Sequence, residues 1–165
     1  MFISKFRLLL PFASLIAAAT LAGPLQAAGT TVTVLLTDKG ANVDSPTNMG
    51  MNMGSMDMSK ATMGIKASPS KAKAGEVTFV VKNTSKDTIH EMILTRLDDP
   101  SKPEPYLENE NRVDEDRAGD LGEVSELDPG ASGKLTVTLK PGKYLLYCNV
   151  PAHYMAGMWT TFTVE

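Results

Sequence analysis

The clearest structural signal in this chain is a short alternating segment enclosed by two turns. Leu135, Val137 and Leu139 alternate with threonines, so an extended strand here has one apolar face and one polar face. The dipeptides at 129–130 and 141–142 are both Pro-Gly, a pair typical of turns. Such a strand buries its apolar face against a second layer, which favours a fold of packed sheets.

Similar segments recur along the chain and predict seven short strands. They span residues 31–37, 64–67, 76–83, 89–94, 135–139, 143–148 and 158–164. Within 76–83, the side chains of Val77, Phe79 and Val81 share one face. No segment has the pattern of an amphipathic helix. The sequence therefore predicts an all-β chain, an antiparallel β-sandwich with Greek-key connections.

The first 28 residues have the pattern of a secretory signal peptide. Lys5 and Arg7 precede an apolar run at 8–19 that is too short to span a bilayer, and small residues follow it. We expect export to a bacterial periplasm, with no stable membrane span after cleavage. Residues 29–165 are predicted to form a single domain, and we expect a monomer.

The mature chain is acidic and has one unpaired thiol. Without Lys5 and Arg7, 14 basic residues face 19 acidic ones, which argues against a nucleic-acid partner. Cys148 is the only cysteine, so an internal disulfide is excluded. An exported free thiol is prone to oxidation unless something protects it, and coordination to a metal would do so.

Four residues could converge on such a metal. His153 lies five residues after Cys148, Met158 five residues after that, and His90 is the only other histidine. The sulfur and nitrogen donors can meet if the chain loops between two strands at this point. Two imidazoles, one thiolate and a weak axial thioether are the donor set of a blue-copper site. Taken singly, each residue has an ordinary explanation in core packing.

On these residues the chain resembles the cupredoxins, the blue type 1 copper proteins. Its pattern of an early histidine followed by Cys-x4-His-x4-Met is most similar to rusticyanin- and sulfocyanin-like members, and it covers residues 64 to 165. The resemblance implies one type 1 copper ion bound by His90, Cys148, His153 and Met158. In the family an asparagine often follows the first histidine. Glu91 stands there in this chain, so Asn83 and Asn149 are the candidates for a hydrogen bond to the cysteine sulfur.

Two segments have unusual compositions. Residues 41–63 contain six methionines, which either bind Cu(I) or fill gaps in the core: Met49, Met51, Met53, Met56, Met58 and Met63. Residues 98–128, here called the acidic insertion, contain twelve acidic and three basic side chains. The insertion is either a solvated connection between strands or an acidic face that attracts a basic partner.

The resemblance implies a carrier of single electrons between redox partners, such as a c-type cytochrome or an oxidase. The alternative is copper handling (buffering, delivery or resistance), which the methionine-rich segment would serve. A multicopper enzyme needs further histidines, and none remain after His90 and His153. We therefore expect no catalysis by this chain. A metal-free β-sandwich that binds another protein is the remaining possibility.

Overall fold

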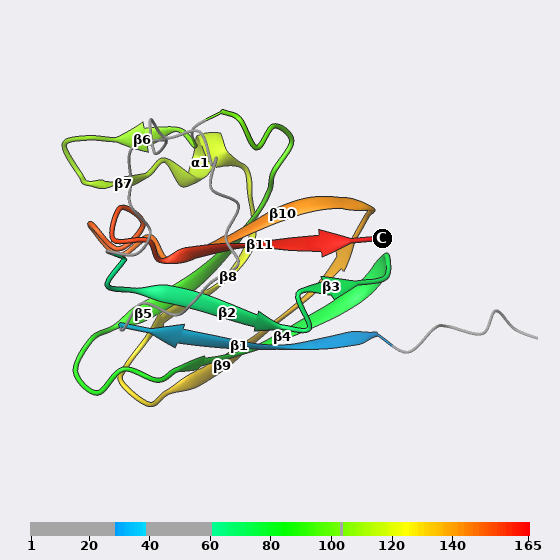
Figure 1. Ribbon diagram of the computed structural model, residues 1–165, viewed down its shortest axis with the longest axis horizontal. Coiled ribbons are helices and arrows are strands. Elements are labelled where there is room, and N and C mark those ends of the chain that lie inside the picture. The colour runs from blue at the N-terminus through cyan, green and yellow to red at the C-terminus, as the bar shows by residue number, and fades with distance from the viewer. Residues whose placement is uncertain (1–28, 39–60, 103) are drawn as a thin grey trace, which may run out of the picture.

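Two β-sheets face each other across an apolar core in the computed structural model, which describes residues 29–38, 61–102 and 104–165 (Figure 1). In the described chain one sheet has the order β2 (Gly64–Ser68), β1 (Thr30–Thr37), β4 (Gly75–Asn83) and β9 (Ser132–Leu139). The other has the order β3 (Lys71–Ala72), β11 (Trp159–Val164), β10 (Gly142–Tyr147), β5 (His90–Arg96) and β8 (Asp120–Leu127). The predicted all-β sandwich is confirmed.

Strand pairing is mostly antiparallel, but two pairs are parallel. These are β1 with β4 and β3 with β11, whereas the other pairs within the two sheets are antiparallel in the described residues. Parallel neighbours need a long crossover connection rather than a tight turn, and more than thirty residues separate β1 from β4. Alternation within a strand carries no information about direction, so the sequence did not predict these two pairs.

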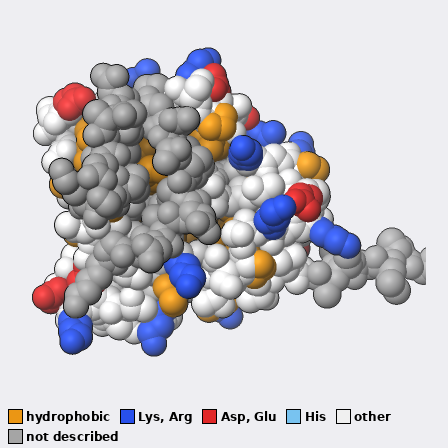
Figure 2. Space-filling view, viewed as in Figure 1, with side chains coloured by type: hydrophobic (Ala, Val, Ile, Leu, Met, Phe, Trp, Pro, Cys, Tyr) orange, Lys and Arg blue, Asp and Glu red, His pale blue; other side chains and the backbone are white. Residues whose placement is uncertain are grey.

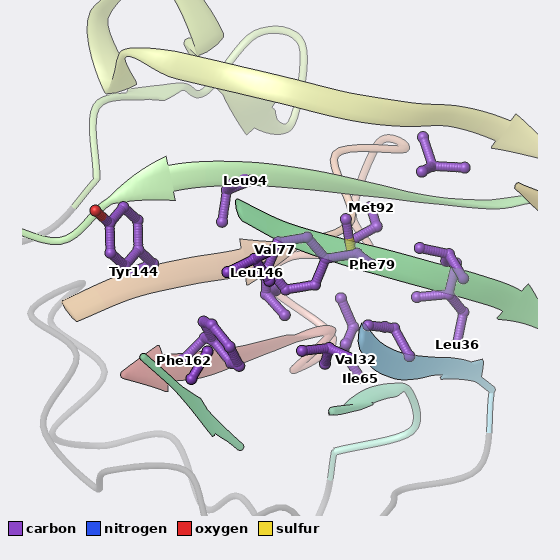
Figure 3. Packing of buried hydrophobic residues seen from close by; sticks show 14 of the residues in the cluster. Val32, Leu36, Ile65, Val77, Phe79, Met92, Leu94, Tyr144, Leu146 and Phe162 are labelled. Atoms are coloured by element: carbon purple, nitrogen blue, oxygen red, sulfur yellow. The ribbon is translucent and has the colours of Figure 1, made fainter. Parts of the chain in front are cut away.

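The main core lies between the two sheets. Val77, Phe79 and Val81 of β4 are fully buried, as the alternation predicted. The ring of Phe79 meets that of Phe162 from β11 edge to face, with centroids 5.2 Å apart, so the two sheets are in direct contact here. Figure 3 shows both rings near Leu146, and Cys148 belongs to the same buried cluster.

The acidic insertion is more ordered than a solvated connection. Its last part is β8, which pairs with β5 at the edge of the five-stranded sheet. Its middle part forms the hairpin of β6 (Tyr106–Leu107) and β7 (Arg112–Val113), followed by the one-turn helix α1 (Glu115–Ala118). These elements cover a second buried cluster on the outer face of the five-stranded sheet, made by Ile93, Leu97, Val113, Leu145, Tyr147, Tyr154 and Trp159.

Two sequence predictions fall on parts of the chain that the structure does not describe. The signal peptide, residues 1–28, lies outside the described residues, as does the methionine-rich segment up to residue 60. Within the described ranges, no helix has the length and apolar character needed to cross a membrane.

Candidate metal centre

The four predicted ligand residues come from two neighbouring places in the five-stranded sheet. His90 is the first residue of β5. Cys148 directly follows β10, and Met158 directly precedes β11, so residues 148–158 form a loop between adjacent strands, here called the site loop. The backbone N–H of Cys148 donates to the carbonyl of Met158 at 3.0 Å, which closes the site loop at its base. This is the loop between two strands that the sequence predicted.

Three donor atoms converge inside this frame. Nδ1 of His90 lies 3.3 Å from Nδ1 of His153, and that nitrogen lies 3.4 Å from Sγ of Cys148. The possible ligand atoms of the three residues all lie within 4.8 Å of one another. His90 and Cys148 are fully buried, and only 9% of His153 is exposed.

Met158 is buried beside these donors. It belongs to the same apolar cluster as Cys148, and its N–H donates to the carbonyl of His153 at 3.1 Å. Its thioether therefore belongs to this cluster and to the last residue of the site loop. Its part as the weak axial ligand stays a prediction.

Burial keeps the three donors neutral when no metal is bound. Loss of hydration lowers the pKa of His90 to about 4, with a further decrease from nearby His153, and burial also lowers the pKa of His153. Burial raises the pKa of the Cys148 thiol to about 12. Near neutral pH, two uncharged imidazoles and a thiol therefore share one buried space.

This set fits a cation of the kind the sequence predicted. Each neutral imidazole has one unprotonated nitrogen, and the two facing Nδ1 atoms cannot both carry protons at 3.3 Å. Nε2 of His90 is buried with no hydrogen-bond partner in the described structure. Two nitrogens and a sulfur around one point would suit a type 1 copper ion, and these donors already lie close together.

The sulfur accepts hydrogen bonds from the backbone. The N–H of Glu91 donates to Sγ of Cys148 at 3.4 Å, and a second backbone contact comes from Val150. Such donors favour the thiolate form. The two asparagines that the sequence suggested bind elsewhere. The side chain of Asn83 donates to the carbonyls of Thr88 and Leu127, and the side chain of Asn149 binds the insertion.

Glu91 connects the two halves of the site. Its Oε1 accepts from the backbone N–H of Asn149 at 2.9 Å, so the residue after His90 is tied to the residue after Cys148. Glu91 is 7% exposed, and burial raises its pKa to about 7. Sequence reasoning missed this link, and the only signal was a glutamate in the position where the family often has asparagine.

An acidic pocket opens beside the site. Its volume is about 430 Å³, and its walls are formed by Ile89, Glu91, Arg112, Glu115, Glu123, Glu126, Asn149, Val150 and Pro151. Four carboxyl groups face one guanidinium there. Figure 2, by contrast, shows the face formed by β2 and β3, where lysine and arginine side chains are scattered with few acidic groups. Several carboxyl groups therefore lie close to the candidate metal centre.

Comparison with known proteins identifies one family. The sequence model for copper binding proteins of the plastocyanin/azurin family matches residues 47–165. No curated protein matches the chain.

Three of the solved structures that are similar to this chain are two auracyanins and a rusticyanin. Dithionite-reduced auracyanin from Roseiflexus castenholzii is 20% identical over 83% of this chain and 98% of its own, with a TM-score of 0.49. Auracyanin A from Chloroflexus aurantiacus is 20% identical over 82% and 99%, with a TM-score of 0.48. Rusticyanin from Thiobacillus ferrooxidans is 18% identical over 83% and 79%, with a TM-score of 0.48.

Proposed function

Because the chain belongs to the plastocyanin/azurin family of copper-binding proteins, we propose that it carries single electrons between redox proteins by means of one type 1 copper ion. The proposed ligands are His90, Cys148, His153 and Met158. The convergence of two imidazole nitrogens and one thiol sulfur in a buried space is the observation that carries this proposal. We propose no catalytic activity, because the sequence has no further histidine for a second copper centre.

The protein's contribution is to hold the donors still. A bound copper ion supplies the one-electron couple between Cu(I) and Cu(II). His90 is fixed by the sheet, since it begins β5, and the site loop is closed by the bond from Cys148 to Met158. Cys148 would hold the ion as a thiolate, and the N–H of Glu91 would stabilise that thiolate. Donors that move little between the two oxidation states keep the reorganisation small.

The direct test is the visible spectrum of the Cu(II)-loaded protein, followed through a cycle of reduction and reoxidation. We expect an intense thiolate-to-copper band in the red region that bleaches on reduction and returns fully on reoxidation. Copper that is bound without this band, or a band that does not return, would contradict an electron carrier with a type 1 site.

Just above neutral pH, the affinity for Cu(II) should fall about tenfold for each unit that the pH drops. The raised pKa of Cys148 means that the metal-free protein holds one thiol proton in this range, and copper must displace it. The pKa of His90, about 4, means that this imidazole has no proton to lose. Titration calorimetry in two buffers of different ionisation enthalpy should give about one proton released per copper. Release of two or more would show that a histidine, or Glu91 with its pKa of about 7, also loses a proton.

We infer that the redox partner docks where the site loop reaches the surface. His153 is slightly exposed there, and its neighbours Pro151 and Ala152 are exposed. The adjacent pocket adds carboxylates, so a partner with a basic surface, such as a c-type cytochrome or an oxidase, is favoured. Its location would be the periplasm if residues 1–28 direct export.

Docking at this place predicts that the rate of electron transfer depends on the salt concentration and on the carboxylates of the pocket. Electron transfer to a cationic cytochrome should slow with rising ionic strength, and the double variant Glu123→Gln/Glu126→Gln should slow it several-fold at low salt. Glu76→Gln, an exposed carboxylate on β4, is the matched control. Equal effects of the control and of the double variant would place docking elsewhere.

One contact favours copper handling as a second candidate function. The N–H of Thr62 donates to the carbonyl of Ala156 at 3.3 Å, and Met63 packs against the cluster that contains Cys148 and Met158. The end of the methionine-rich segment therefore lies against the site loop. A Cu(I) chelator separates the two functions, because a carrier retains its metal in both oxidation states and a handling protein releases Cu(I).

A further inference from the structure

The middle of the acidic insertion is bonded directly to the site loop. We call residues 104–118 the brace segment; it contains β6, β7 and α1 and lies next to the site loop (Figure 1). The side chain of Asn149 accepts from the N–H of Val113 at 2.7 Å. It donates to the carbonyl of Val113 at 2.9 Å and to Oε1 of Glu115 at 2.7 Å. Asn149 is 2% exposed; its two hydrogen bonds to Val113 are buried, and its bond to Glu115 is partly buried.

Another hydrogen bond between the brace segment and the site loop fixes an unusual backbone conformation just before His153. Ala152 has φ of 72°, in the left-handed region that L side chains rarely adopt. Its N–H donates to the carbonyl of Asn111 in the brace segment at 2.8 Å. A conformation of this kind persists only when its surroundings impose it. The brace segment provides that constraint, one residue from a donor of the metal centre.

Aromatic packing fixes the residue on the other side of His153. Tyr154 is 1% exposed, and its ring lies against that of Tyr106 in the brace segment, with centroids 6.4 Å apart. On its other side it meets Tyr147 edge to face at 5.8 Å. Both sequence neighbours of His153 are thus held by residues outside the site loop.

We propose that the brace segment holds the site loop in the shape that binds copper, and that Asn149 is the positioning residue that joins them. The inference rests on the proposed function, since it assigns to these contacts the retention and tuning of the same metal. Asn149 is the junction of the arrangement, because its backbone is bonded to Glu91 while its side chain is bonded to Val113 and Glu115. Outer groups of this kind set how firmly the ligands hold a metal.

A purely structural role predicts a different outcome. Val113 is 1% exposed and helps to cover the second cluster, so the brace segment also contributes to stability. If that were its whole role, weakening its contacts would lower the melting temperature and leave the properties of the copper centre unchanged.

The test compares Asn149→Asp with a rescue and a control. Aspartate retains the acceptor for the N–H of Val113, but it cannot donate to the carbonyl of Val113 and it places a carboxylate against Glu115. The double variant Asn149→Asp/Glu115→Gln restores a donor and an acceptor across that contact. Thr95→Val is the control, because Thr95 donates to the carbonyls of Ala118 and Gly119 at the end of the insertion's helix and no bond joins it to the site loop in the described structure.

Three measurements are made on folded protein. Transfer of Cu(I) to bathocuproine disulfonate should be about 10- to 100-fold faster in Asn149→Asp, the range found for lost outer partners of metal ligands. The visible band of the Cu(II) form should shift. In the metal-free protein, the amide of Ala152 should exchange with deuterium faster than in the wild type. The double variant should recover part of each change, and Thr95→Val should show none.

The inference would be overturned if Asn149→Asp had the same rate of Cu(I) release, the same visible band and the same Ala152 amide exchange as the wild type. It would also be overturned if Thr95→Val changed these three properties as much as Asn149→Asp does. A wild-type protein without the thiolate-to-copper band would instead overturn the proposed function, and with it the copper half of this inference. The exchange of the Ala152 amide needs no metal, so it separates these two failures.

Discussion

Replacing Cys148 by serine should abolish the intense visible absorption of the Cu(II)-loaded protein. The band requires a thiolate bonded to the ion, and a buried serine hydroxyl does not ionise near neutral pH. Cys148 is also the only donor of the set that becomes negative on binding, so its loss removes the charge that balances the metal. We expect copper affinity to fall by more than about 100-fold, which is the upper end of the loss when a hydrogen-bond partner of a metal ligand is removed.

The control for this variant is Met92→Leu. Met92 is fully buried in the same cluster as Cys148 but is not a proposed ligand. It tests whether loss of any core sulfur alters the centre. Absorption spectroscopy and equilibrium dialysis measure the two effects. A Cys148→Ser protein that keeps the red band, or a Met92→Leu protein that loses it, would show that the ligands have been assigned wrongly.

Alternation in the sequence and burial in the structure agree most clearly in β4, one of the strands that the sequence predicted. In β4 every second residue from Val77 to Asn83 is buried, so the period of two was visible. In β8 only Val124 is buried, and the pairing with β5 contains two register shifts. An edge strand that exposes acidic side chains is held mainly by backbone hydrogen bonds, which every residue can make. Composition therefore indicated a solvated segment where the structure has a strand.

The same limit applies to the candidate site. The sequence singled out His90, Cys148 and His153 because they are all the histidines and cysteines of the chain, and the structure brings them together. The donor to the sulfur is a backbone N–H, from Glu91, and no residue type marks it. The bonds from Asn149 to Val113 likewise end on backbone atoms. Which backbone atoms become partners depends on where the acidic insertion packs against the sheet. The pattern of strands in the sequence does not determine that position.

The largest loss of stability should follow from Phe79→Ala. Phe79 is fully buried, and its edge-to-face contact with Phe162 at 5.2 Å joins β4 of one sheet to β11 of the other. Truncation removes the ring and leaves a cavity between two rigid layers, at a cost of about 3–5 kcal/mol. A domain of this size is stable by only about 5–15 kcal/mol, so a large part of the total is lost. Urea unfolding of the metal-free protein measures it.

A matched truncation at the surface isolates the effect of burial. Leu121 is 45% exposed in the edge strand β8, and Leu121→Ala should change the free energy of unfolding by no more than about 0.5 kcal/mol. The metal-free form is used because bound copper stabilises only the folded state and would mask part of the loss. If Phe79→Ala cost no more than Leu121→Ala, the core between the sheets would not be the element that holds the site's two neighbouring strands in place.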